Sequence, residues 1–141
     1  MPTLIYTDAL VDINGVDLSD HVRSVTLTYE AEMLDDTAMG TSGTRSTKPG
    51  LKGWTLAVEF YQDFAAGSVD ATHFPLIGAV AFPIRVRPMK ASPISATNPE
   101  YQGNAVLESY PPITGEVGAL GMASASYRAG GGSALVRDIT L

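Results

Sequence analysis

Few residues in this sequence could perform catalysis or bind a metal. The two histidines, His21 and His73, lie far apart, and neither belongs to an HExxH or HxH pattern. Ser19-Asp20-His21 combines the residue types of a hydrolase triad. However, neighbouring residues of an extended chain point to alternate sides, so the three cannot form a hydrogen-bond relay. The absence of cysteine excludes thiol catalysis, disulfides and cysteine-ligated metals.

Two further motifs also fail as ligand sites. The stretch 40–48 is rich in glycine and hydroxyl groups, but Lys48 is followed by Pro49 and not by the Ser or Thr of a phosphate-binding loop. Asp35-Asp36 lacks the alternating ligands and closing Glu of a calcium-binding EF-hand loop, and turn capping accounts for the pair. The sequence therefore predicts no catalytic residue, no metal site and no cofactor, and the protein is not expected to be an enzyme.

Nucleic-acid binding is a weaker alternative. Proteins that bind single strands combine a positive groove with exposed aromatic side chains. Here 15 acidic and 9 basic residues give a net charge of −6. Arg85, Arg87 and Lys90 nevertheless form a small basic cluster, so an OB-like single-strand-binding protein remains a possible class.

The composition and the hydrophobic pattern predict one all-β domain over residues 1–141. With 45% hydrophobic and 17% charged residues among 141, the chain should fold around a single core. Apolar and polar residues alternate along 23–30 and 54–60, which predicts two strands that each have one apolar face. These faces supply the expected core anchors, which are Val25, Leu27, Tyr29, Trp54, Leu56, Val58 and Phe60.

Other segments complete a β-sandwich or a partly closed antiparallel barrel. Asn14-Gly15 predicts a hairpin between 9–13 and 16–18. Further strands are expected in 82–86, where Pro83 indicates an edge or a strand start, and in 104–110, 119–128 and 135–141. One short flanking helix is expected over 68–77, capped by Ser68. The glycine-rich run 129–133 is interpreted as a flexible hinge, and the longest apolar stretch, 74–84, is too short to insert in a membrane.

The segment 33–53 has neither strand nor helix period and is predicted to be a long early loop between strands. Such a loop is either mobile or ordered by contacts outside the monomer. Residues 1–36 hold eight acids and one base, whereas 37–52 hold three bases and no acid, so the two regions could attract each other within one chain or between copies. The expected inter-subunit residues are Met33, Asp35, Asp36, Met39, Gly40, Arg45, Lys48, Pro49, Leu51 and Lys52.

Three stretches carry a resemblance to a known family. They are NGVDLSDHVRSVTLTYEAEMLDDTAMG (14–40), GLKGWTLAVEFYQDFAAGSVDATHFPLIG (50–78) and SATNPEYQGNAVLESYPPI (95–113). In the order of these phrases the chain resembles the tail tube (major tail) proteins of long-tailed bacteriophages of the siphophage type. The resemblance implies hexameric rings that stack into a hollow tube with a β-lined, acidic lumen for DNA ejection. Glu30, Glu59 and Glu108 are the candidate lumen-facing acids, since each lies on the polar side of an expected strand.

The resemblance also implies partners and a location. The chain would bind other copies of itself within and between rings, and also tape-measure, tail terminator and baseplate or initiator proteins. Genomic DNA would pass through the tube without specific binding. The protein would be assembled in the cytoplasm of the bacterial host and reside in the virion tail. A tail terminator or decoration subunit is the alternative within the same structural class.

Overall fold

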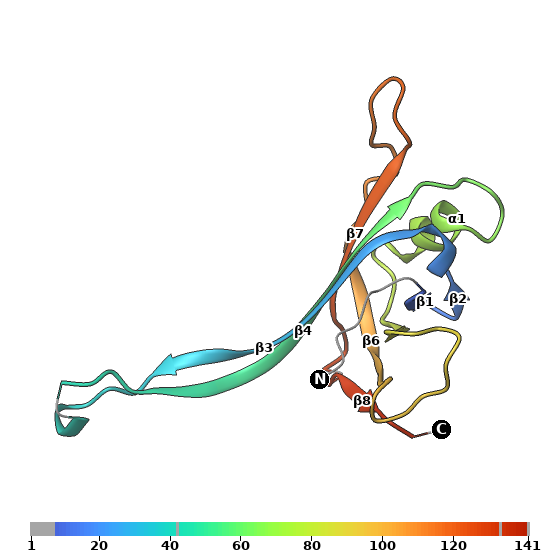
Figure 1. Cartoon of the computed structure of the whole chain (residues 1–141). Helices are drawn as coiled ribbons and strands as arrows, with labels where there is room; N and C mark the ends of the chain where they lie inside the picture. The colour runs from blue at the N-terminus through green and yellow to red at the C-terminus, as the bar shows by residue number, and fades with distance from the viewer. Residues whose placement is uncertain (1–7, 42, 133, 141) are drawn as a thin grey trace.

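The computed structural model describes residues 8–41, 43–132 and 134–140 and shows an all-β fold with one short α-helix (Figure 1). The elements along the described chain are β1 (Leu10–Ile13), β2 (Val16–Asp17), η1 (Ser19–His21), β3 (Val22–Asp35), η2 (Met39–Thr41), β4 (Thr47–Tyr61), α1 (Val69–His73), η3 (Phe74–Leu76), β5 (Phe82–Arg87), β6 (Glu100–Ser109), β7 (Met122–Ala129) and β8 (Val136–Asp138).

The strands form one antiparallel sheet that bends around its own core. Its order is β2-β1-β5-β6-β7-β4-β3, and β8 pairs with the beginning of β6. The core contains residues of β1 and β5, such as Ile13 and Ile84, together with residues of β4 and β7, such as Leu56 and Tyr127. The two ends of the sheet thus pack against each other, which confirms the sandwich-like class; β2 and β3 remain unpaired edges, so the barrel is not closed.

The early hairpin forms as its sequence predicts. Asn14 and Gly15 both have positive φ, 52° and 80°, which is the backbone of a type I′ turn. The turn joins β1 to β2, and Ile13 pairs with Val16 across it. All four residues of β1 are buried, so this hairpin closes one end of the core.

The apolar face of β4 lies at the centre of the core. Trp54, Leu56, Val58 and Phe60 are at most 2% exposed. The indole of Trp54 lies over Gly103 of β6, where a Cβ atom would sit 2.7 Å from Cζ2 of Trp54. Glycine at 103 is therefore a requirement of close packing.

The helix lies where it was expected but is shorter. Residues 69–73 are α-helical and 74–76 continue as a 3₁₀ turn. Ser68 occupies the N-cap position, yet its hydroxyl donates to Asp63 Oδ2 at 2.8 Å and makes no capping bond. The prediction of a side-chain cap was wrong because a nearby carboxylate competes for the hydroxyl.

The predicted long loop is mostly a β-ribbon. β3 and β4 remain paired as far as Leu34↔Lys48 and Asp35↔Thr47, so only residues 36–46 connect them. Figure 1 shows this ribbon extending far from the body of the domain. Both of its faces are in solvent, and it therefore has no alternation of apolar and polar residues by which its sequence would indicate a strand.

Tyr29 is a second correction, because it is 47% exposed instead of being a core anchor. It lies at the base of the ribbon, beyond the part of β3 that faces the core. Val25 and Leu27 are only partly buried and pack against the edge of the core. The inward-facing side chains of β3 therefore become more exposed from Val25 and Leu27 to Tyr29.

Two other local expectations can be compared with the structure. Pro83 is the second residue of β5, which confirms the strand-start alternative; the strand lies between β1 and β6, so the edge alternative is wrong. Gly130 is buried, and its N–H donates to the carbonyl of Asn104 at 2.9 Å, so the interpretation of 129–133 as a hinge is wrong at this residue. A side chain at 130 would meet Val106, whereas Ser133 lies outside the described residues.

We predict that Gly103→Ala lowers the free energy of unfolding by about 1–3 kcal/mol, because the added methyl group overlaps the Trp54 ring. Gly53→Ala is the matched control, since a Cβ atom there meets nothing within 4 Å. The free energy of unfolding of each variant is measured by urea denaturation, with Trp54 fluorescence as the probe. Equal stability of the two variants would show that the indole can move aside.

Candidate assembly surfaces

The polar side of the sheet is rich in hydroxyl groups. The small residues that β3, β4 and β7 direct away from the core align in rows across the sheet, as in Thr26–Ala57–Ser126. This surface, here called the hydroxyl face, comprises Ser24, Thr26, Thr28, Thr55, Ala57, Ser124 and Ser126.

The three candidate acids lie on this same side of the sheet. Glu59 accepts a hydrogen bond from Arg23 Nη1 at 2.9 Å, and Glu108 Oε2 pairs with Arg128 Nε at 2.8 Å. The pKa of Arg128 is raised by Glu108 first and by Glu30 in addition. The structure thus brings Glu30, Glu59 and Glu108 to one surface, but two of the three are already neutralised by arginines.

β3 offers an unpaired edge beside the hydroxyl face. It is 14 residues long, and among the described strands it pairs with β4 alone. A long free edge exposes backbone N–H and C=O groups that can pair with a strand of another chain. Edges of this length are usually blocked in monomeric proteins.

The ribbon exposes apolar side chains with nothing to cover them. Met33 is 62% exposed, Leu51 is 81% exposed and Met39, near the tip, is fully exposed. An isolated two-stranded ribbon is at best marginally stable in water. Assembly with another surface would both cover these side chains and fix the ribbon.

Two of the three ribbon cations pair within the same chain. Arg45 lies 3.4 Å from Asp35, and Lys48 lies 3.4 Å from Asp36. Asp35 also accepts the N–H of Thr37 at 2.9 Å, so it caps the turn as predicted. Lys52 has no ion-pair partner among the described residues and is the cation that remains available to a neighbour.

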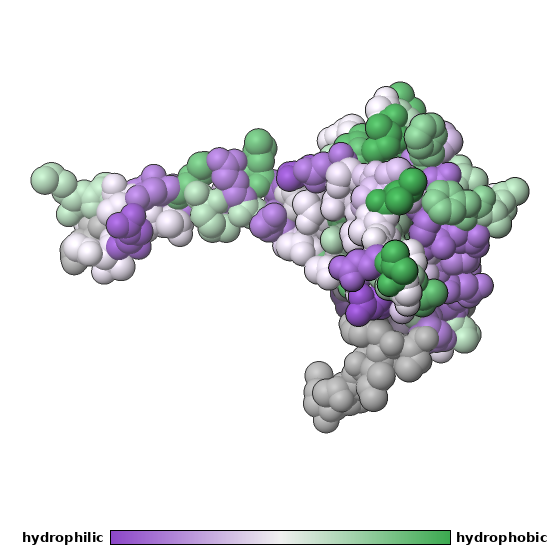
Figure 2. Space-filling view, turned by 90° about the horizontal axis from the view of Figure 1, so that it is seen from above, coloured by the Kyte–Doolittle hydropathy of each residue, from purple (hydrophilic) through white to green (hydrophobic). Residues whose placement is uncertain are grey.

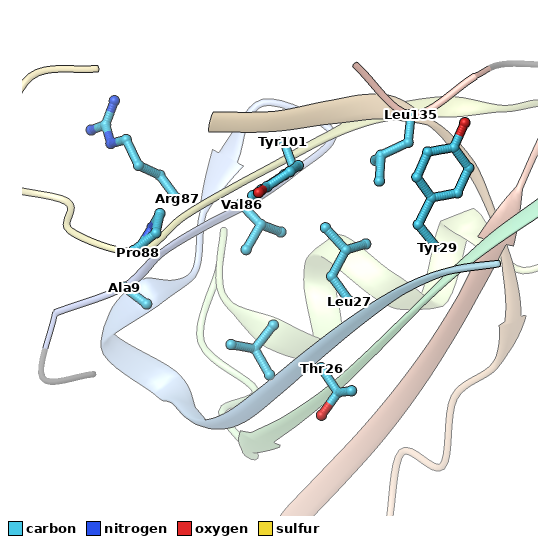
Figure 3. Close-up of a pocket in the computed structure, with 10 residues that line it drawn as sticks. Ala9, Thr26, Leu27, Tyr29, Val86, Arg87, Pro88, Tyr101 and Leu135 are labelled. Carbon is cyan, nitrogen blue, oxygen red and sulfur yellow. The ribbon is translucent and has the colours of Figure 1, made fainter. Parts of the chain in front are cut away.

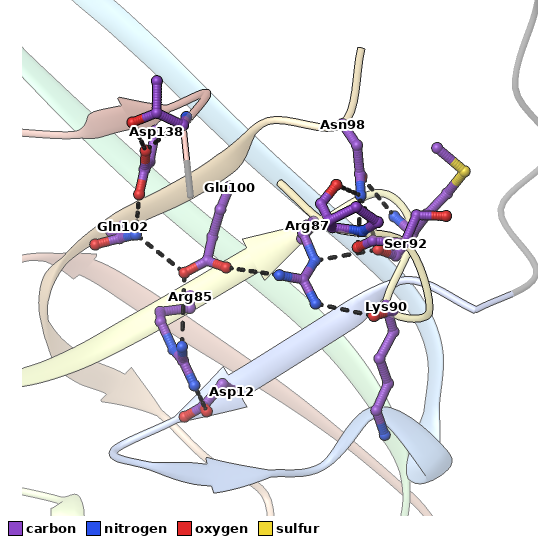
Figure 4. A network of polar contacts seen from close by, with 12 residues as sticks. Asp12, Arg85, Arg87, Lys90, Ser92, Asn98, Glu100, Gln102 and Asp138 are labelled. Carbon is purple, nitrogen blue, oxygen red and sulfur yellow. Dashed lines mark hydrogen bonds and ion pairs between the residues drawn. The ribbon is translucent and has the colours of Figure 1, made fainter. Parts of the chain in front are cut away.

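The basic cluster predicted near residue 87 is part of a balanced charge network (Figure 4). Arg85 Nη2 lies 2.5 Å from Asp12, and Arg87 Nη1 donates to Glu100 at 3.1 Å. Lys90 Nζ lies 2.7 Å from Asp17. The hydrogen bond to Asp12 raises the pKa of Arg85. The sequence did not indicate this network because its acids lie on other strands, and no free basic groove remains here for nucleic acid.

The residues that could have formed a hydrolytic site do not converge. Ser19 Oγ donates to Asp17 at 2.5 Å, whereas His21 Nε2 contacts Asp63 at 2.9 Å. Ser68 donates to the same Asp63 oxygen, so the carboxylate and not the histidine lies in the middle, and no base contacts a nucleophile. In the described parts of the chain no three metal-ligating side chains cluster, and no helix there has the length and apolarity of a membrane span.

His73 is a structural residue of the core. It is fully buried, and its Nδ1 donates to the carbonyl of Val69 at 2.8 Å, which leaves Nε2 to accept the hydroxyl of Tyr127. Its ring also stacks on Tyr110 with 5.1 Å between centroids. Burial lowers the pKa of His73 and raises the pKa of the Tyr127 hydroxyl. The pair ties α1 to β7.

Comparison with known proteins gives a fold match and no sequence match. No protein-family model matches the chain, and no curated protein matches it. A chain of the native gene transfer agent virion superposes with a TM-score of 0.70 at 13% identity, covering 92% of this chain and 95% of that one. A chain of the extended PVC sheath/tube terminator, from an extracellular contractile injection system, superposes with a TM-score of 0.71 at 10% identity, covering 98% and 97%.

The chain has the fold of phage tail tube and sheath–tube proteins. A chain from the tail of the empty gene transfer agent, refined with C6 symmetry, agrees as well, with a TM-score of 0.67 and 16% identity over 92% of this chain and 94% of that one. Since each match covers nearly all of both chains, the tail-tube fold accounts for the ribbon as well as the body.

We predict a pH dependence of stability from His73. The lowered pKa in the folded state means that the unfolded chain, with a histidine pKa of about 6.5, binds a proton first as the pH falls. The contribution of His73 is therefore complete above the unfolded-state pKa and decreases as the pH falls below it. His73→Gln should reduce the slope of the free energy of unfolding against pH, as measured by urea denaturation at a series of pH values. Equal slopes in wild type and His73→Gln would contradict this.

Proposed function

We propose that this chain is a structural subunit of a tail tube. Copies associate into hexameric rings, and the rings stack into a hollow conduit through which DNA leaves the particle. The tail-tube fold, the free β3 edge and the ribbon support this proposal. No catalytic role is proposed.

The ribbon is the observation that carries the proposal. Full burial of a Met or Leu side chain stabilises by about 1.5–3 kcal/mol, and the ribbon holds Met33, Leu34, Met39 and Leu51 in exposed positions. A monomer gains nothing from these side chains, whereas a subunit whose ribbon lies on a neighbour gains their burial. In this assembly the ribbon is the arm that connects subunits, and the inter-subunit residues expected within 33–53 act from a paired β-ribbon.

The hydroxyl face forms the wall of the conduit in this proposal. Three strands, β7, β4 and β3, contribute to it, and the free β3 edge extends the wall into the next subunit. Glu30, Glu59 and Glu108 lie on this wall. Arg23 and Arg128 are paired with carboxylates, so the wall presents no free cation to which DNA phosphates would bind. DNA would therefore pass without adhering.

The partners are proposed from the position that a tube occupies within a phage tail. Copies of this chain are the main partner, and tape-measure, tail terminator and baseplate or initiator proteins contact the tube. The protein would be assembled in the cytoplasm of the bacterial host and remain in the virion tail.

A terminator or decoration subunit is the second candidate. The overlap with a chain of the PVC sheath/tube terminator structure supports it, because that match is as good as the match to gene transfer agent chains. The two roles differ in what the purified protein forms. A tube subunit gives filaments one ring wide, and a terminator gives discrete rings.

Negative-stain microscopy of the purified protein tests the tube directly, and we expect filaments. The double variant Met39→Glu/Leu51→Glu should remove them while the monomer keeps its circular-dichroism spectrum and melting temperature, because both side chains are exposed. Thr44→Glu is the control, since it adds charge near the tip without removing an apolar side chain. Filaments of the double variant equal to wild type would exclude the ribbon as the connecting arm.

Hydrogen exchange gives a second expected outcome. The amides of residues 39–51 should exchange quickly in the monomer, because an isolated two-stranded ribbon is marginally stable in water, and slowly in filaments. Amides of the core strand β7 serve as the internal reference, because assembly should change them little. Equal protection of 39–51 in both states would reject ordering of the ribbon by neighbours.

A further inference from the structure

The connection between β6 and β7 is an ordered loop with an apolar surface. Gln62 Nε2 donates to the carbonyl of Pro112 at 2.6 Å, and Met122 N–H donates to the carbonyl of Thr114 at 3.0 Å. The loop nevertheless exposes three apolar side chains, Ile113 (87%), Val117 (fully) and Leu120 (72%). It projects from the top of the domain in Figure 1, and hydrophobic side chains gather on that end in Figure 2.

The domain also has an apolar groove (Figure 3). It measures about 600 Å³ and lies between the inner side of β3 and strands β5 and β6. Its walls include Leu27, Tyr29, Val86, Tyr101 and Leu135. The groove exists because β3 diverges from the core towards the ribbon, so its last inward-facing side chains remain half covered.

Loop and groove stand at opposite ends of one strand. Tyr101 of the groove is the second residue of β6, and the loop begins directly after Ser109, the last residue of that strand. Ten residues of β-strand span about 30 Å. The loop therefore lies about 30 Å along β6 from the Tyr101 end of the groove in its own chain, whereas it can enter that end of the groove in a copy placed beyond it.

An unpaired charge accompanies each of the two surfaces. Glu116 is the one charged residue of the loop, is exposed and has no ion-pair partner in the described parts of the chain. Arg137 is likewise exposed and unpaired there. It pairs in register with Tyr101, whose side chain lines the groove, and Leu135, just before β8, lines the groove as well. A cation thus lies beside the groove, opposite in sign to the acid of the loop.

We propose that the β6–β7 loop of one copy inserts into the groove of a second copy. Ile113, Val117 and Leu120 then lie against Leu27, Tyr29 and Val86, and Glu116 lies beside Arg137. The contact joins two different surfaces, so it repeats head to tail, as stacking of successive rings requires. It rests on the proposed function, because it connects copies within a tube, but it is a separate contact from the ribbon.

Charge reversal tests this contact. We expect Glu116→Arg and Arg137→Glu each to raise the half-maximal concentration for filament formation about threefold to tenfold, and the double reversal to restore it to within about twofold of wild type. Asp20→Arg is the matched control, because it makes the same change in charge at an exposed acid outside loop and groove. Light scattering measures assembly, and melting temperatures confirm that each monomer is folded.

A second variant tests the apolar part. Val117→Asp should raise the same concentration at least about tenfold, because insertion would bury a carboxylate without a partner. The proposal is overturned if wild type forms filaments but Val117→Asp matches it, or if the double reversal is no better than the single ones. In either case the tube itself stands and another surface, or a small apolar ligand, occupies the groove. Absence of wild-type filaments under all conditions would overturn both proposals.

Discussion

Burial of one face of β4 is the interaction on which the rest of the structure depends. From Trp54 to Phe60 this face lies in the core, where Trp54 packs on Gly103. The same 15-residue strand begins at Thr47, in solvent, as half of the ribbon. Because the paired ribbon continues directly from a buried strand, the core fixes the direction in which it leaves the domain. The stability of the body thus positions a segment that would be marginal alone.

Many charges of the body are paired within the described parts of the chain, whereas some charges of the ribbon, the β6–β7 loop and β8 are not. Within the body, Asp12, Glu100 and Asp17 neutralise the cations of β5 and the segment after it. On the polar side of the sheet, arginines neutralise two of three glutamates. Lys52, Glu116 and Arg137, which have no ion-pair partner among the described residues, lie in the ribbon, the β6–β7 loop and the short last strand. These projecting or terminal elements are the ones that another copy can reach.

Much of the fold could be predicted from local patterns. The Asn14-Gly15 hairpin, the alternation along 54–60 and the short helix before Gly78 each depend on residues close together in sequence. The errors share one cause. The ribbon has no apolar face because neither of its sides is covered, and Tyr29 has a strand pattern although the opposite wall is missing. Period two indicates a strand only where one face is buried.

By itself the sequence determined the all-β class, the main core strand and the absence of any spacing suited to catalysis, because these depend on residue type and local order. Only the tertiary structure decided which charges meet, since the partners of Arg85 and Arg87 lie on other strands. It also decided that 33–35 pairs with 47–49 in a projecting ribbon, and that an apolar loop and an apolar groove occupy opposite ends of β6. Distances between segments remote in sequence depend on how the sheet bends, and no local pattern specifies that bend.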